Sequence, residues 1–326
     1  NCTQTTEFSL AGFTEDPTTQ VTLFLLFLLT YLVTILGNLG MITLIRASAL
    51  LHSPMYYFLG NLAFVNLCTS TTITPRMLAG VFLGKKGITY AGCMAQIFTF
   101  GLFVVTECFL LAAMAYDRYV AICHPLLYLL VMSPERCSWL VTSSYLLGLT
   151  NGICALLVSS SCLAGATNAA LHTGLALRLS FCGPKGIRHF YCEGPPLFAL
   201  SCTDPAPNEL GTFLMAGFSL AATVLAILLS YARILAAALG THSAAGKRKA
   251  FSTCASQLAA VALFYGSLVS MYCRRSSRSS REPDKVASVF HTMVTPMLNP
   301  FIYSLRNQEV KAGLWRLMGR KHSAEK

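Results

Sequence analysis

The sequence predicts an all-α membrane protein: a bundle of seven transmembrane helices with an extracellular N-terminus and a short amphipathic helix after the seventh span. The 326-residue chain is 54% hydrophobic and only 11% charged, whereas about 25% of a soluble domain is charged. Charge-poor runs long enough to cross a bilayer, about 20 residues each, occur seven times. Basic residues gather after the last of these runs, which gives the bundle an orientation.

Six of the seven runs contain no Asp, Glu, Lys or Arg, and the third is interrupted only by Glu107. The predicted spans are residues 21–45, 54–75, 87–116, 138 to about 163, 210–232, 250–273 and 286–305. We therefore expect an extracellular tail over residues 1–20, a seven-transmembrane domain over 21–305 and a cytoplasmic tail over 306–326.

The tails set the orientation. The first tail has three acidic residues and no Lys or Arg, while the last has six basic residues. The positive-inside rule places the N-terminus outside, and Asn1 begins a glycosylation sequon that agrees with this. The net charge of +11 comes from loops and tails, so we expect a lipid bilayer and no nucleic acid as partner. The basic outer loop 274–281 is interpreted as solvated, with attraction of acidic ligands or sulfated surface sugars as the alternative.

The sequence has thirteen cysteines. Cys93 lies at the outer entry to the third span, and three more lie in the long outer loop between the fourth and fifth spans, where disulfides can form: Cys182, Cys192 and Cys202. Four cysteines allow three pairings, and the residues alone do not choose among them.

The strongest motif is MAYDRYVAICHP at residues 114–125, at the inner end of the third span. Further motifs are Gly37-Asn38, PMYYFL at 54–59, Ser230-Tyr231, KAFSTCAS at 249–256 and PMLNPFIYSLRN at 296–307. Together they resemble the tetrapod-type odorant receptors, a branch of the rhodopsin-like G-protein-coupled receptors. The resemblance covers the chain from end to end.

The resemblance implies an activation switch where a heterotrimeric G protein binds. Its expected members are Asp117, Arg118, Tyr119, Tyr231, Asn299, Pro300 and Tyr303. Asp117 is expected to hold Arg118 at rest, the two inner tyrosines to approach the arginine on activation, and the proline to kink the seventh helix. The alternatives are an ordinary snorkelling Asp-Arg pair and a kink without a signalling role.

Glu107 is an ionisable group at mid-membrane depth, which suggests a function. In the family a glutamate here joins an aspartate of the second span in a sodium site or polar network, but this chain has Asn66 at the aspartate's place. A sodium ion near Glu107 and a protonated Glu107 hydrogen-bonded around Asn66 both remain open. The resemblance also implies the disulfides Cys93–Cys192 and Cys182–Cys202.

The expected ligand lies in the outer half of the bundle. The candidate contacts are mostly apolar with a few hydroxyls: Phe100, Gly101, Val104, Val105, Met215, Ser219, Tyr265, Leu268, Val269, Tyr272, Val289 and Thr292. Such a set suits a small, volatile, weakly polar odorant held by dispersion and one or two hydrogen bonds. We expect no cofactor, because Met293 stands near the place of the opsin retinal lysine.

The sequence thus predicts a plasma-membrane odorant receptor, in olfactory cilia, that raises cAMP through a stimulatory G protein and is not an enzyme. The main alternative is a receptor of the same architecture for a non-odorant ligand. A seven-span transporter is a further alternative, but no internal repeat of the kind common in transporters is present.

Overall fold

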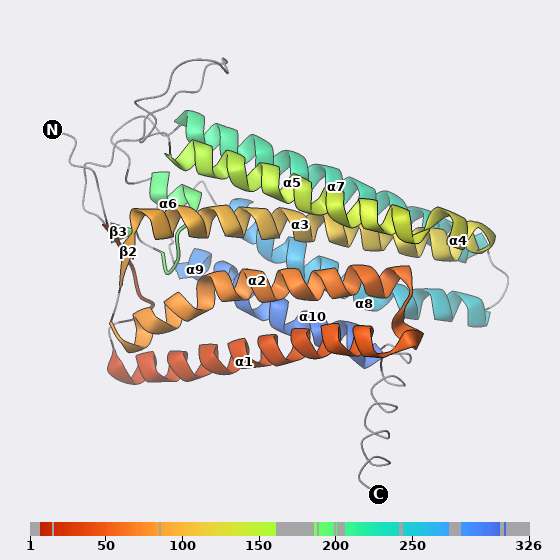
Figure 1. The fold of residues 1–326 in the computed structure, drawn as a ribbon, viewed down its shortest axis with the longest axis horizontal. Helices are drawn as coiled ribbons and strands as arrows, with labels where there is room; N and C mark the ends of the chain where they lie inside the picture. Colours follow the sequence, from red (N-terminus) through yellow and green to blue (C-terminus); the bar gives the residue numbers. More distant parts are fainter. Residues whose placement is uncertain are drawn as a thin grey trace, which may run out of the picture. The chain divides into compact units, whose positions relative to one another are not determined.

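The computed structural model describes residues 7–14, 16–84, 86–160, 186–187, 189–198, 200, 206–240, 244–273, 282–306 and 310. Its long helices follow the predicted spans (Figure 1). They are α1 (Pro17–Ala47), α2 (Pro54–Phe82), α3 (Tyr90–Cys123), α5 (Pro134–Ser160), α7 (Ala206–Gly240) and α8 (Ala244–Cys273). The seventh span is α9 (Glu282–Val289), the π-helical turn η3 (Phe290–Val294) and α10 (Thr295–Arg306).

Short elements connect the long helices. Strands β1 (Glu7–Leu10), β2 (Gly87–Thr89) and β3 (Gly186–Ile187) precede α1, α3 and α6 (Gly194–Phe198). The turn η1 (Ala49–Leu51) joins α1 to α2, while η2 (Pro125–Leu127) and α4 (Tyr128–Val131) join α3 to α5. The predicted amphipathic helix after Arg306 lies outside the described part of the chain, except for Val310, whose side chain is buried.

Local sequence determines where several helices begin. Asp16 precedes Pro17, and its carboxylate accepts hydrogen bonds from the backbone N–H and the hydroxyl of Thr19, at 2.8 and 2.6 Å. Ser133 precedes Pro134, and its hydroxyl accepts from the N–H of Arg136 at 3.4 Å. A capping side chain followed by proline is a favoured helix start, since proline has no N–H to leave unpaired.

The chain divides into two compact units. Unit 1 comprises Asn1–Leu28, Thr71–Thr106 and Tyr145–Ala221. Within it β1 pairs antiparallel with β2 and parallel with β3, in the order β2-β1-β3. An apolar cluster joins this sheet to the first turns of α3: Phe8, Leu10, Ile88, Cys93, Met94, Ile97, Ile187, Cys192 and Leu197.

The second part of α5, from Tyr145 onward, belongs to unit 1 and packs closely on α3. A Cβ at Gly148 would lie 2.5 Å from the carbonyl oxygen of Leu102 and would also collide with the Thr106 hydroxyl. Glycine at this position therefore lets the two helix backbones approach one another.

Unit 2 comprises Leu29–Ser70, Glu107–Ser144 and Ala222–Lys326. Within it α10 runs beside the second part of α1 (Figure 1). The Asn38 amide donates to the carbonyl of Pro296 at 3.0 Å, and a Cβ at Gly37 would lie 3.3 Å from the ring of Pro300. The Gly37-Asn38 pair of α1 thus receives the proline-containing segment of α10.

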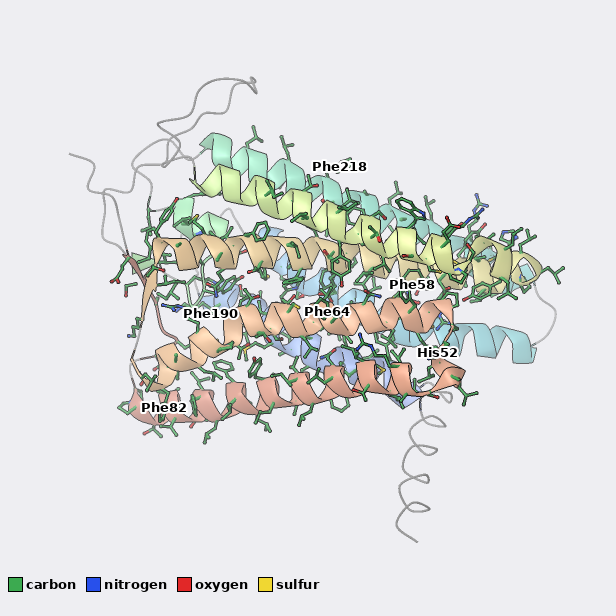
Figure 2. All side chains as sticks on the ribbon, viewed as in Figure 1. His52, Phe58, Phe64, Phe82, Phe190 and Phe218 are labelled. Carbon is green, nitrogen blue, oxygen red and sulfur yellow. A yellow bond between two sulfur atoms is a disulfide. The ribbon has the colours of Figure 1, made fainter. Side chains whose placement is uncertain are left out.

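Many large apolar side chains are exposed, as expected where lipid is the solvent. Phe218 of α7 is 75% exposed and projects away from its helix, whereas Phe58 of α2 is fully buried (Figure 2). Three described helices are long and apolar enough to cross a membrane by length and composition alone: α1, α3 and Glu209–Gly240 of α7. The second helix buries several polar residues, including Asn66, Thr69 and Ser70.

Several helices extend beyond the charge-free runs that predicted them, but the third begins only at Tyr90, because residues 87–89 of its run form β2. Pro75, where the second predicted span ended, lies inside α2, which continues to Phe82. A proline bends a helix that neighbouring segments support and does not necessarily end it.

Candidate functional site

The end of α3 carries the predicted switch, and its carboxylate bonds to a tyrosine. The sequence predicts that Asp117 holds Arg118; in the structure the Tyr128 hydroxyl of α4 donates to Oδ1 of Asp117 at 2.8 Å. The other carboxylate oxygen is buried and has no hydrogen-bond partner among the described residues. Tyr128 lies outside the membrane spans, and burial, together with the Asp117 charge, raises its pKa. The phenol therefore stays protonated and able to donate.

Three polar groups of unit 2 are buried near one another without hydrogen bonds. In the described part of the chain, Nε of Arg118 and the hydroxyls of Tyr231 and Tyr303 have no partner. The Arg118 charge lies within electrostatic range of both phenols. A buried polar group left unpaired is costly, so these three groups favour any rearrangement that lets them bond to one another or to a partner.

Tyr119, the third residue of the Asp-Arg-Tyr motif, turns toward the end of α3. Its hydroxyl lies 3.0 Å from Nε2 of His124, and the two rings meet edge-on with centroids 5.4 Å apart. This contact is exposed, so it shapes the surface that precedes α4.

A buried chain of amides links α1, α2, α3 and α10. The Asn299 amide donates to Oδ1 of Asn66 at 3.3 Å and to Oε1 of Glu107 at 3.4 Å. Asn66 in turn donates to Oδ1 of Asn38 at 3.5 Å. The four residues are at most 3% exposed. Asn299 therefore connects the two predicted network members, Asn66 and Glu107, besides preceding the kink at Pro300.

The side-chain oxygen of Asn299, Oδ1, has no hydrogen-bond partner within the described segments. It lies in the same network as the carboxylate of Glu107. Oδ1 of Asn299 can therefore still accept a hydrogen bond from a water molecule or coordinate a cation.

The comparisons with known proteins decide the family. The olfactory receptor family model matches residues 27–321. The chain is 49% identical to human olfactory receptor 8D4 over 99% of its own length and 98% of the relative's. It is 48% identical to mouse olfactory receptor 5AP2, over 98% and 95% of the two chains. The chain belongs to the olfactory receptor family.

The fold agrees with this membership. Squid rhodopsin is a solved structure similar to this one, with a TM-score of 0.68 at 18% identity, over 92% of this chain and 81% of the other. The olfactory receptor is therefore a multi-pass, seven-transmembrane G-protein-coupled receptor for odorants, and it is not an enzyme.

The predicted ligand residues of this olfactory receptor are distributed over both units. In unit 1, three of these residues of α3 are buried: Phe100, Val104 and Val105. Gly101 and Ser219 are partly exposed. The centroids of the Phe100 and Tyr191 rings lie 5.4 Å apart. The side chains of Met215 and Tyr272 lie outside the described part of the chain.

In unit 2, Tyr265 and Leu268 of α8 are buried, whereas Val269 is 39% exposed. Tyr265 donates to the carbonyl of Cys108 at 3.3 Å. Val289 is partly exposed at the end of α9. Thr292 is fully buried in η3, and its hydroxyl donates to the Ser288 carbonyl at 2.7 Å. Thr292 can therefore offer a ligand an acceptor only.

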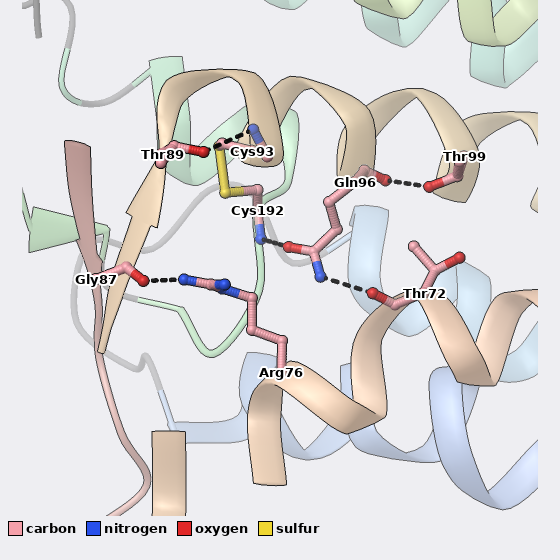
Figure 3. Close-up of a disulfide and its surroundings, with 9 residues drawn as sticks. Thr72, Arg76, Gly87, Thr89, Cys93, Gln96, Thr99 and Cys192 are labelled. Atoms are coloured by element: carbon pink, nitrogen blue, oxygen red, sulfur yellow. Dashed lines mark hydrogen bonds between the residues drawn. A yellow bond between two sulfur atoms is a disulfide. The ribbon is translucent and has the colours of Figure 1, made fainter. Parts of the chain in front are cut away.

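The disulfide between Cys93 and Cys192 ties the first turn of α3 to the segment after β3 (Figure 3). The pair Cys182–Cys202 and the glycosylation site Asn1 fall outside the described residues. Gln96 supports the disulfide: its side-chain oxygen accepts from the Cys192 N–H at 2.9 Å and its amide donates to the Thr72 carbonyl at 3.1 Å. Arg76 donates to the carbonyl of Gly87 in the same region.

Three roles were not predicted from the sequence. They are the hydrogen bond of Tyr128 to Asp117, the support of the disulfide by Gln96, and the place of Asn38 in the buried network. Asn38 stands in a motif that was noted, and Tyr128 lies three residues beyond the 114–125 motif, so both were near a signal. No sequence signal indicated Gln96, because a single glutamine in an apolar helix does not show which groups it will bond to.

Proposed function

We propose that this olfactory receptor couples odorant binding to a stimulatory, olfactory-type G protein and raises cAMP in the cilia of olfactory neurons. Membership of the family supports coupling to a G protein in general. The sequence resemblance to tetrapod-type odorant receptors supports the stimulatory type and the ciliary location.

The proposed switch centres on Arg118. The observation that carries it is the set of unpaired buried groups: Nε of Arg118 and the hydroxyls of Tyr231 and Tyr303. A conformation in which they bond to one another, or in which Arg118 bonds to a G-protein segment, would satisfy groups that this conformation leaves unsatisfied. Activation is then a population shift between two packings of the inner helix ends.

We further propose that Asn66, Glu107 and Asn299 transmit the change, because one amide of α10 contacts both α2 and α3. A displacement of α10 at Pro300 would break or re-form these hydrogen bonds. A sodium ion beside Glu107 would have one protein carboxylate, since residue 66 is an asparagine.

The proposed odorant is small, volatile and weakly polar. The predicted contacts on α3 are apolar and buried, so dispersion and shape provide most of the binding. Thr292 offers an acceptor but no free donor, which favours odorants that carry a hydroxyl over those that carry only a carbonyl.

The proposal is tested by expressing the full chain in cells lacking stimulatory G-protein α subunits, with and without the olfactory-type subunit restored. The cells are challenged with a broad odorant panel and cAMP is measured. We expect at least one odorant to raise cAMP only when the subunit is restored. A response to a peptide or lipid with silence across the panel would contradict the olfactory role, and a response without the subunit would contradict the stimulatory coupling.

A further inference from the structure

A groove of about 490 Å³ is lined by residues of α3, α5 and α7, all of them in unit 2. Its lining includes Phe109 and Tyr116 of α3, Leu140 of α5, and Ala226, Leu229 and Arg233 of α7. None of the predicted ligand residues lines it, and Tyr119 is the one switch residue that does. The groove is therefore separate from the proposed odorant contacts.

Four of the five hydroxyl groups that line the groove have hydrogen-bond partners, and the fifth belongs to the exposed Tyr116. Ser143 and Ser144 both donate to the carbonyl of Leu140, at 3.0 and 2.7 Å. Ser230 donates to the carbonyl of Ala226 at 2.8 Å, and the Tyr119 hydroxyl bonds to His124 at 3.0 Å. The wall thus behaves as an apolar surface toward any occupant.

Arg233 is the only charged residue among those that line the groove. It is exposed, and it follows Tyr231 by two residues, near the end of the span that the orientation places at the cytoplasmic face. A long basic side chain at that depth extends its charge to the membrane interface while its methylene groups stay against apolar surface. The groove therefore has an apolar length and one positive end.

The lipid-facing side of the groove is open. Leu229 is 57% exposed and Tyr116 is 41% exposed, so in a bilayer hydrocarbon chains reach the wall directly. The volume falls within the range of ~300–1,000 Å³ typical of small-molecule sites. The cytoplasmic leaflet is the one rich in anionic phospholipids.

We propose that this groove binds an anionic phospholipid of the cytoplasmic leaflet. One acyl chain lies along Phe109, Leu140 and Leu229, and the head group is held by the Arg233 guanidinium. Charge complementarity with Arg233 selects the anionic class, because a zwitterionic head group gains less from a single cation.

The test is to purify the full-length receptor in neutral detergent, add phosphatidylserine or phosphatidylcholine with identical acyl chains, and count the bound lipids by native mass spectrometry. The wild type should retain phosphatidylserine about fivefold better than phosphatidylcholine, the factor expected from one basic residue. Arg233→Gln should remove this preference, and Arg233→Lys should keep most of it.

Two controls separate the groove from the general surface. Arg46→Gln removes another exposed arginine, near the end of α1, and should leave the preference intact. Ala226→Trp fills the groove without changing charge and should abolish tight binding of the anionic lipid, whereas Ala232→Trp, at an exposed position of α7 outside the lining, should not.

Equal retention of phosphatidylserine by the wild type and Arg233→Gln would overturn the proposal, as would unchanged binding by Ala226→Trp. Displacement of phosphatidylserine by an equal concentration of oleate would also overturn it, because the occupant would then be a fatty acid. The measurement uses neither odorant nor G protein, so its outcome is independent of the proposed signalling function.

Discussion

The Tyr128 hydroxyl donates a hydrogen bond of 2.8 Å to the carboxylate of Asp117. The contact joins the end of α3 to the short helix α4, and it gives Asp117 a partner other than Arg118. Arg118 is thereby left without a hydrogen bond at Nε within the described residues. The Arg118 side chain as a whole is partly exposed, so the unsatisfied group is one buried nitrogen of its guanidinium.

Replacing Tyr128 by phenylalanine removes the hydrogen bond and leaves the buried Asp117 carboxylate without its donor. The expected cost is about 1–3 kcal/mol, seen as a lower melting temperature of the detergent-solubilised receptor. Tyr116→Phe, which alters an exposed tyrosine of α3, the helix that carries Asp117, should melt like the wild type. Equal melting of the two variants would show that the Tyr128 contact does not stabilise the receptor.

Replacing Asn299 by alanine breaks the link between α10 and both α2 and α3. Oδ1 of Asn66 and Oε1 of Glu107 would each lose a donor, and we expect a loss of about 1–3 kcal/mol together with a weaker cAMP response. The matched control is Asn61→Ala, because Asn61 bonds only to the Tyr57 carbonyl of its own helix. A variant with normal melting and normal signalling would argue against a connecting role.

Replacing Asn66 by aspartate adds a second carboxylate to the network around Glu107. Two carboxylates attract a cation more strongly than one, so the variant should gain thermal stability in NaCl relative to choline chloride at equal ionic strength. The wild type should show a smaller difference. If sodium stabilises both proteins equally, the asparagine is not what limits sodium binding.

Replacing Gly148 by alanine introduces a Cβ 2.5 Å from the Leu102 carbonyl oxygen. Overpacking of this kind costs about 1–3 kcal/mol, and the melting temperature should fall. Gly217→Ala is the control, since a Cβ there meets nothing within 4 Å and alanine favours a helix by about 1 kcal/mol over glycine. Equal behaviour would mean that α3 and α5 can separate without loss.

The sequence predicted the long helices because lipid imposes a simple rule, a charge-poor run of sufficient length, on each span. The family resemblance also implied that residue 66 and Glu107 share one polar network, and the structure joins both to Asn299. It did not predict that Asn299 would be the connection, or that Tyr128 would take the Asp117 carboxylate. Both depend on how separate helices pack, which the residue pattern along one helix does not encode.

For the disulfide, too, one part could be predicted from the sequence and another part could not. The resemblance implied Cys93–Cys192, and the structure contains it. The supporting role of Gln96 emerged only from the geometry, because its two partners lie 24 and 96 residues away in the chain.

We propose that Arg118 is the cation through which this receptor activates its G protein. The most direct measurement compares odorant-stimulated cAMP in cells that express the wild type, Arg118→Ala or the control Arg46→Ala, with surface expression quantified for each. The account predicts that Arg118→Ala reaches the surface and gives no odorant response, while Arg46→Ala responds normally. A full response from Arg118→Ala at comparable surface expression would contradict the account.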